Sequence, residues 1–284
     1  MNKLLLSTTL LFLATIQIDA QTFNLHSNGI TIVCEDASVG DTGDVNGVEY
    51  TKRTRDQITP DNASTTCTSG ITNMANLFFT QEFIDYGFNE DISHWDVSNV
   101  TDMVGMFHDA HVFNGDLSAW DVSKVTNMHQ MFRHSRSFNG EIGNWDVSNV
   151  DDMSEMFFDA QSFNQPIGDW NTGSVTTMAR MFNGAVLFNQ DISGWNTSKV
   201  TTTYRMFFNA HMFNQPLDSW DVSSVTDMAT MFAEAHAFNQ PLNSWNTSNV
   251  QRTGSMFWGA RSFNQDLNNW DMSADTNMTT MFVY

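Results

Sequence analysis

Positive charge is scarce in this sequence. Lys and Arg together number 12 against 32 Asp and Glu, which gives a formal net charge of −20 over 284 residues. Nucleic-acid binding depends on clustered Lys and Arg that neutralise phosphates, so we expect no nucleic-acid partner. The same deficit argues against adsorption on an anionic membrane surface. A large net charge favours a soluble, separate molecule, and we expect the chain to be a monomer.

Long hydrophobic runs are also few. One apolar stretch, Leu4 to Ile18, follows the basic start Met1-Asn2-Lys3 and ends close to the small residue Ala20. This order is typical of a secretory signal peptide, which we predict over residues 1–20. The stretch is short for a membrane span, and no second run of spanning length follows, so no transmembrane segment is expected. The mature chain is therefore predicted to be extracellular, either secreted or held at the cell surface.

Only two cysteines occur, Cys34 and Cys67. In an exported chain a lone pair is most simply a disulfide, and closing this loop would stabilise the fold by roughly 3–4 kcal/mol. The alternative is a two-thiol metal site, although no partner ligands lie nearby in the sequence. Residues 21–70 hold both cysteines and the β-forming run from Ile30 to Val33, and predict a small β-rich N-terminal cap. Such a cap would cover the apolar end of a repeat array.

The rest of the chain is strictly periodic. Tryptophan recurs at a constant spacing of 25 residues, and Phe-Asn and Met-Phe pairs keep the same step. A fixed short period predicts a solenoid of stacked, nearly identical coils over residues 71–284, with about eight coils after a degenerate first repeat. The tryptophans form one structural ladder: Trp95, Trp120, Trp145, Trp170, Trp195, Trp220, Trp245 and Trp270. The chain stops at Tyr284, midway through a coil, so we expect the C-terminal end of the array to be truncated.

Each coil reads as a short strand followed by a short helix. Trp95, Asp96 and Val97 alternate apolar, polar and apolar, as a half-buried strand does. The apolar residues from Met103 to Ala110 fall at i, i+3, i+4 and i+7, which is one face of a helix, and Thr101 is a suitable N-cap. The expected fold class is therefore α/β, a solenoid of 25-residue strand–helix coils with a parallel β-sheet. The Asn that follows each repeated Phe, from Asn89 to Asn264, is expected to form an internal amide ladder.

One coil shows the motif clearly. It runs from Phe213-Asn214-Gln215-Pro216-Leu217 through Trp220-Asp221-Val222-Ser223 to Val225-Thr226, Met228 and Met231-Phe232. This pattern resembles a family of bacterial surface proteins with repeats of about 25 residues, related to the BspA-like leucine-rich-repeat proteins and of the mycoplasma-lipoprotein type. The resemblance covers about residues 71–284. It implies a secreted or cell-surface protein that acts in adhesion, and it carries no catalytic residues to this chain.

The position after each tryptophan is the best candidate for a ligand-binding face. It carries Asp96, Asp121, Asp146, Asn171, Asn196, Asp221, Asn246 and Asp271. Stacked carboxylates repel one another unless they bind a cation, and oxygen ligands suit Ca²⁺. The competing interpretation is a solvated polar face in which Asn reduces repulsion, because no ligand-dense calcium loop is present. We therefore expect no cofactor, with Ca²⁺ as a minor alternative.

Other candidates are weaker. Phe158, Phe208 and Trp258 share one position, as either an apolar contact patch or packing between coils, and packing is the preferred interpretation. His111, His211 and His236 share another, but the intervening coils lack ligands, so we expect no metal site there. Phosphate loops and zinc-helix motifs are missing from the sequence, and no enzymatic activity is expected.

The sequence therefore predicts a non-enzymatic secreted or cell-surface repeat protein. Its expected role is a binding or adhesion module that presents a regular surface to a protein or glycan partner. The alternative is a structural spacer or coat component that holds another domain away from the cell.

Overall fold

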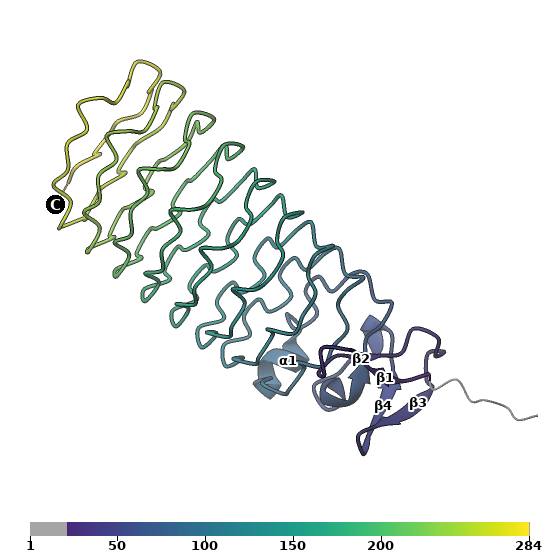
Figure 1. Cartoon of the computed structure of the whole chain (residues 1–284). Helices are drawn as coiled ribbons and strands as arrows, with labels where there is room; N and C mark the ends of the chain where they lie inside the picture. Colours follow the sequence, from purple (N-terminus) through teal and green to yellow (C-terminus); the bar gives the residue numbers. More distant parts are fainter. Residues whose placement is uncertain (1–21, 284) are drawn as a thin grey trace, which may run out of the picture.

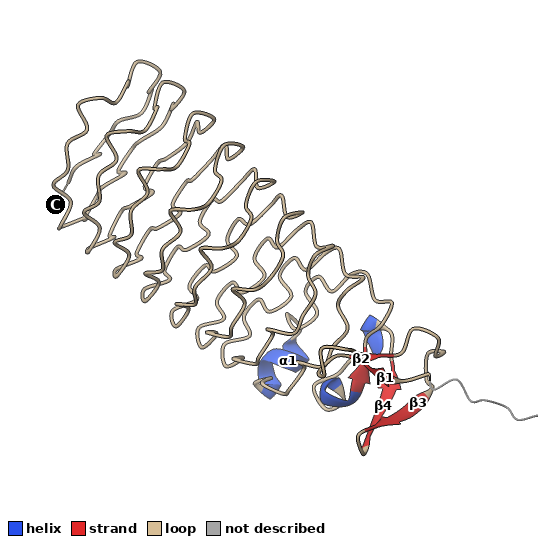
Figure 2. Ribbon diagram, viewed as in Figure 1, coloured by secondary structure: helices blue, strands red, loops and turns tan. Residues whose placement is uncertain are grey.

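A computed structural model of the chain describes residues 22–283, apart from the side chains of residues 85 and 86. The predicted signal peptide over residues 1–20 lies outside the described residues. Figure 1 shows an elongated molecule in which successive coils lie side by side from the N-terminal cap to the C-terminal end. In the described part of the chain, the regular strands are confined to the cap and the coils are drawn as loop (Figure 2).

The cap is built from two small sheets. Strands β1 (Asn24–Leu25) and β2 (Ile32–Val33) pair antiparallel. In the second sheet, β4 (Val48–Lys52) pairs antiparallel with β3 (Thr42–Val45) and parallel with β5 (Thr66–Cys67). Two 3₁₀ turns, Arg55–Gln57 and Ala63–Thr65, lead back to β5.

A disulfide fastens the two sheets of the cap. Cys34 and Cys67 are bonded, with their Cα atoms 6.4 Å apart, which confirms the predicted pairing. Both cysteines are fully buried, and they pack with Phe23, Ile32 and Val45 in a small core of their own. Gly43 allows this packing, because a Cβ at that position would overlap the Phe23 ring. The cap is thus a compact unit with its own apolar centre.

The cap also closes the first coil. Trp95 donates its indole N–H to the Ala63 carbonyl at 3.0 Å, and the Ile32 N–H donates to the His94 carbonyl at 2.8 Å. Ile58 and Ala63 belong to the core that runs through the coils. Between the cap and the second repeat lies helix α1 (Gln81–Tyr86), where the chain is four residues longer than in a regular coil, since Phe78 and Phe88 are ten residues apart and the equivalent Phe107 and Phe113 are six apart. Its αL C-cap, Gly87, at a φ of 69°, ends the helix.

The coils are not strand–helix units, and this part of the fold prediction was wrong. In residues 22–283, helix α1 is the one α-helix, and the segment from Met103 to Ala110 is a series of turns. The predicted strand at Trp95–Val97 is not formed either. One residue of each coil instead makes a parallel bridge to the next, in the order Asn73, Asp102, Asn127, Asp152, Thr177, Thr202, Asp227, Arg252 and Asn277.

Hydrogen bonding between coils explains why no helix forms. The N–H groups of Met103, Gly105 and Phe107 donate to carbonyls of the next coil, whereas those of Met106 and His108 donate three residues back. In an α-helix all of these N–H groups would donate to carbonyls four residues back in the same segment. Gly105, with a φ of 57°, takes the left-handed conformation that this alternation requires, and so does Asp109, at 58°. Successive turns place apolar residues at the same spacing as a helix does. The set of buried apolar residues from Met103 to Ala110 was therefore predicted correctly, whereas the helical backbone was not.

Thr101 is likewise not an N-cap. The equivalent Thr126 donates both its N–H and its hydroxyl to the carbonyl of Thr101, at 2.9 and 3.2 Å. The same pair of bonds recurs where Thr226 meets Thr201. These threonines connect neighbouring coils.

Aromatic columns fill the interior. The Trp170 and Trp195 rings lie 6.3 Å apart and nearly parallel, and the Trp195 indole N–H donates to the Ile167 carbonyl at 2.9 Å. Phenylalanines stack alongside, as between Phe157 and Phe182 at 5.6 Å. The predicted amide ladder forms, since each Asn side-chain oxygen from Asn89 to Asn239 accepts the backbone N–H of the equivalent Asn one coil later. These asparagines are exposed or half-buried, so the prediction that the ladder is internal was wrong. The architecture is that of a repeat protein with β-bridged coils and few helices.

Candidate ligand-binding face

We refer to the positions that follow the tryptophans as the carboxylate row: Asp96, Asp121, Asp146, Asn171, Asn196, Asp221, Asn246 and Asp271. Asp96, nearest the cap, is buried, and the other seven are exposed. The side chains therefore recur once per coil along the surface of the stack. They lie in turns rather than on the parallel sheet that the sequence predicted.

A local hydrogen bond fixes each side chain of the row. The Oδ1 atom of Asp121 accepts the N–H of Ser123 at 3.1 Å, and Asn196 accepts that of Ser198 at the same distance. This is an Asx-turn, which needs only a side-chain carbonyl oxygen at the first position. Asp and Asn meet that requirement equally, and this explains why both occur in the row. The residue choice then affects the charge of the surface and leaves the turn unchanged.

Neighbouring serines lower the pKa of three acidic members of the row. The hydroxyl and the backbone N–H of Ser148 donate to Asp146 and lower the pKa of its carboxyl group. Ser223 lowers the pKa of Asp221 in the same way, and Ser273 that of Asp271. Hydrogen bonds to the charged form favour that form. The ionised form of Asp146, Asp221 and Asp271 is therefore favoured, and the neutral Asn171, Asn196 and Asn246 separate these negative charges along the row.

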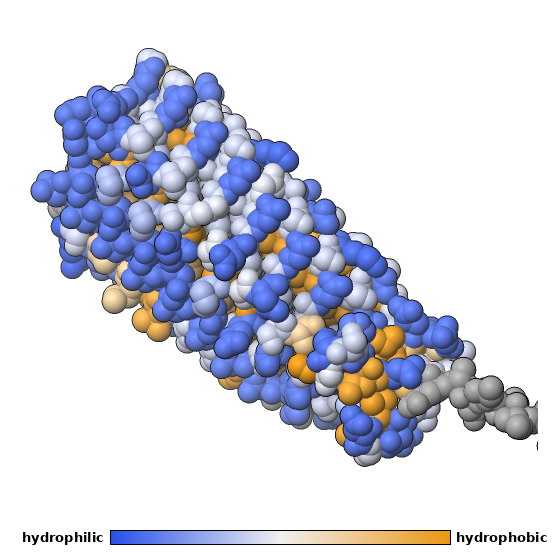
Figure 3. Space-filling view, in the orientation of Figure 1, coloured by the Kyte–Doolittle hydropathy of each residue, from blue (hydrophilic) through white to orange (hydrophobic). Residues whose placement is uncertain are grey.

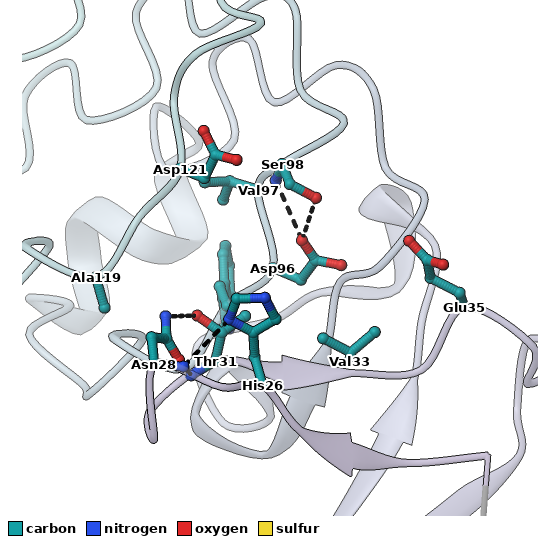
Figure 4. A pocket seen from close by; sticks show the side chains of 11 residues that line it. His26, Asn28, Thr31, Val33, Glu35, Asp96, Val97, Ser98, Ala119 and Asp121 are labelled. Atoms are coloured by element: carbon teal, nitrogen blue, oxygen red, sulfur yellow. Dashed lines mark hydrogen bonds between the residues drawn. The ribbon is translucent and has the colours of Figure 1, made fainter. Parts of the chain in front are cut away.

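A groove lies where the row meets the cap. The cap contributes His26, Asn28 and Glu35 to its lining, and the first coils contribute Asp96 and Asp121 (Figure 4). The cavity measures about 290 Å³. The sequence analysis missed this groove, because the cap does not repeat and its residues carry no periodic signal that would align them with the coils.

Hydrogen bonds order both sides of the groove. Asp96 accepts the hydroxyls of Ser69 at 2.5 Å and Ser98 at 2.7 Å. On the cap side, Asn28 donates its side-chain amide to the Thr31 hydroxyl at 2.9 Å (Figure 4). Asp96 is thus buried and hydrogen-bonded between the cap and the first coil, and Asp121 is the first member of the row that is exposed to a partner.

A second surface combines arginines with aromatic rings. Arg133 lies over the Phe158 ring at 4.9 Å, and Arg205 lies over Phe208 at 5.1 Å. Both rings are partly buried, which agrees with the packing interpretation, whereas Trp258 in the same position is 41% exposed. Large apolar side chains elsewhere on the surface include Leu187 and Met212, which are one coil apart. In Figure 3, polar side chains cover most of the visible face of the stack, and a group of apolar atoms lies near the cap.

Comparison with known proteins places the chain in a family. The features above define a class, a repeat protein of stacked coils with an N-terminal disulfide-bonded cap. The family model described as "Mycoplasma protein of unknown function, DUF285" matches residues 49–157, 137–225 and 195–284, and the chain belongs to this family. The finer relation to BspA-like leucine-rich-repeat proteins stays a prediction.

Other comparisons add little. No curated protein matches the chain. Among solved structures, the one titled "Crystal structure of TLR13-ssRNA13 complex" aligns with 79% of this chain and 39% of that chain, at 8% identity and a TM-score of 0.19. The chain thus spans well under half of that protein, and the TM-score is too low to support any argument. In residues 22–283, no helix is both long and apolar enough to cross a bilayer.

Proposed function

We propose that this protein is a non-enzymatic binding module that acts at or outside the cell surface, and that the carboxylate row is its contact face. In this proposal the coils form a solenoid whose rigid core presents the row to a partner. The observation that carries the proposal is the repetition of an exposed Asp or Asn, held in the same Asx-turn, in seven consecutive coils.

The chemistry of the row favours a partner with basic groups. Asp121, Asp146 and Asp221 are exposed acids, and neighbouring serines lower the pKa of Asp146 and Asp221. A negative surface attracts Lys- or Arg-bearing segments and increases the association rate. We therefore propose a protein partner with a basic contact surface, ahead of a glycan. The buried disulfide supports an oxidising, extracellular compartment for the encounter.

Matched variants test this proposal. The row variant carries Asp121→Asn, Asp146→Asn and Asp221→Asn, which keeps the Asx-turns and removes three charges. The control variant carries Asp116→Asn, Asp191→Asn and Asp266→Asn. These three side chains are also exposed, and each accepts the backbone N–H of the residue two positions later at 2.9 Å, as in the row. Both variants lose the same charge, so the position of the lost charge is the variable.

The experiment is a binding screen against extracellular-matrix proteins and glycans, with and without Ca²⁺. The proposal predicts a saturable interaction that the row variant weakens at least tenfold and the control variant leaves within twofold. Equal binding by the wild type and the row variant would contradict it. A requirement for Ca²⁺ would instead support the alternative in which the row binds a cation.

A structural spacer is the second candidate. The continuous ring stacks favour it, since Phe232 and Phe257, 5.7 Å apart, belong to a column that continues from the cap to the last coil. A stack of this kind would hold an attached domain at a fixed distance. Failure of the screen under every condition would favour this role.

A further inference from the structure

Three potential metal ligands meet at one place on the turns of the first coils. They are His108, Asp109 and His134, and their ligand atoms all lie within 4.8 Å of one another. His134 Nδ1 is 2.8 Å from Asp109 Oδ1, and His108 Nε2 is 3.8 Å from Asp109 Oδ2. No other group of three His, Cys, Asp or Glu with this proximity occurs in the part of the chain that the structure describes.

The repeat geometry creates this juxtaposition. Asp109 and His134 occupy the same position in neighbouring coils, both with a φ of 58°. The N–H of Asp109 donates to the carbonyl of Arg133 at 2.9 Å, so the two backbones are held side by side. The equal left-handed conformations place the two side chains next to each other. His108 is the residue before Asp109 and completes the set.

Neighbouring rings fix both imidazoles. The His108 ring stacks on Phe79 at 4.0 Å, with an angle of 7° between the planes. The His134 ring meets the edge of Phe158 at 5.4 Å, and His111 hydrogen-bonds the His134 carbonyl at 2.9 Å. The three ligand side chains are 11%, 27% and 27% exposed, so an ion can reach them from solvent.

We propose that His108, Asp109 and His134 bind one divalent transition-metal ion of the zinc class. A tetrahedral ion with bonds of about 2.0–2.2 Å separates its ligand atoms by ~3.4 Å. The ligand atoms of the three residues all lie within 4.8 Å of one another, and the imidazoles are 2.8 Å from one Asp109 oxygen and 3.8 Å from the other, so small side-chain shifts bring the set to that spacing. Two imidazoles and one carboxylate suit Zn²⁺, Ni²⁺ or Cu²⁺, whereas Ca²⁺ and Mg²⁺ prefer oxygen ligands alone. Three protein ligands leave one coordination position open to water or to a group from a partner.

The surrounding charges permit a cation. Arg133 is a permanent positive charge that acts on His108, and it is paired with Glu155 at 3.3 Å. Arg136 is paired with Asp159 at 3.0 Å.

Titration of the purified chain, without a polyhistidine tag, with Zn²⁺ tests the site. We expect one ion per chain and at least a tenfold loss of affinity in both Asp109→Asn and His134→Asn. Asparagine is compatible with this backbone, because Asn209 occupies the same position with a φ of 60°. The melting temperature without metal should match that of the wild type in both variants.

His236→Asn is the matched control. His236 also contacts a carboxylate, with its Nε2 atom 2.7 Å from Glu234, and its ring stacks on His211 at 4.5 Å, but the ligand atoms of these three residues do not all lie within 4.8 Å of one another. The affinity of the His236→Asn variant for Zn²⁺ should equal that of the wild type. The proposal is overturned if the Asp109 and His134 variants bind as tightly as the wild type, if the control loses affinity equally, or if the wild type binds no Zn²⁺.

Discussion

At the scale of single residues, the fold assigns separate tasks to neighbouring positions. Trp170 is buried and donates its indole N–H to the Ile142 carbonyl at 3.0 Å, whereas Asn171 beside it is exposed. The tryptophan supplies packing and a bond to the preceding coil. The following Asp or Asn supplies a turn and a surface charge. Stability and recognition can therefore be changed independently at adjacent residues.

The tryptophan column is expected to be a major source of stability. Trp170→Ala should lower the free energy of unfolding by about 3–5 kcal/mol, because it leaves a cavity and removes a buried hydrogen bond. Urea denaturation measures the change. Asn171→Asp should stay within about 0.5 kcal/mol of the wild type, as surface substitutions usually do. Equal losses of stability in the two variants would contradict the claim that Trp170 stabilises the fold and Asn171 does not.

At the scale of elements, the cap is fastened in two ways. The disulfide joins β5 to the segment after β2, and His94 joins the first coil to β5. The His94 Nε2 atom is 3.0 Å from the Thr66 carbonyl, and its ring lies 5.1 Å from Tyr50. The cap thereby covers the apolar end of the stack.

Removal of the disulfide should destabilise the cap. Replacing Cys34 and Cys67 with Ser together is expected to cost about 3–4 kcal/mol, because the unfolded chain gains the entropy of an open loop. Thermal unfolding of this variant, beside the wild type with and without reductant, tests the estimate. If reductant destabilised the double variant as much as the wild type, the disulfide could not be the cause.

The cap should also respond to mild acid. Burial, the largest effect, lowers the folded-state pKa of His94 below its ordinary 6.5, although the bond to Thr66 opposes the shift. The unfolded chain then binds the proton more readily, so this stability is present above pH 6.5 and is lost as the pH falls below it. His94→Gln can keep a donor to Thr66, and its melting temperature should depend less on pH between 7 and 5. An unchanged pH dependence would exclude His94 as its source.

How much the sequence predicts differs between these elements. The tryptophan and asparagine ladders follow from the period, because equal positions of stacked coils must meet, and the disulfide follows from the presence of only two cysteines in the chain. The backbone of the coil does not follow, since Met103, Met106 and Phe107 keep the same spacing in consecutive turns as in a helix. The proposed metal-ligand set does not follow from the period, because His108 and His134 occupy adjacent positions of the repeat and not the same one.

At the scale of the whole molecule, each coil contacts only its neighbours, so the stack should tolerate the loss of one complete repeat. Deletion of residues 171–195 joins Trp170 to Asn196 and keeps every column in register. We expect a folded protein with a single cooperative transition and somewhat lower stability, measured by urea unfolding. Deletion of residues 171–182 breaks the register and should prevent folding of the coils that follow. Equivalent behaviour of the two deletions would contradict a repeat-by-repeat fold.

The central claim is that the negative charges of the carboxylate row bind a partner with basic groups. The most direct test is the salt dependence of that binding, compared between the wild type, the row variant and the control variant. Electrostatic attraction between exposed charges is screened by salt. The account predicts that the affinity of the wild type and of the control variant falls steeply between 50 and 500 mM NaCl, whereas the weaker affinity of the row variant changes little. An equally steep fall in the row variant would show that the row is not the contact face.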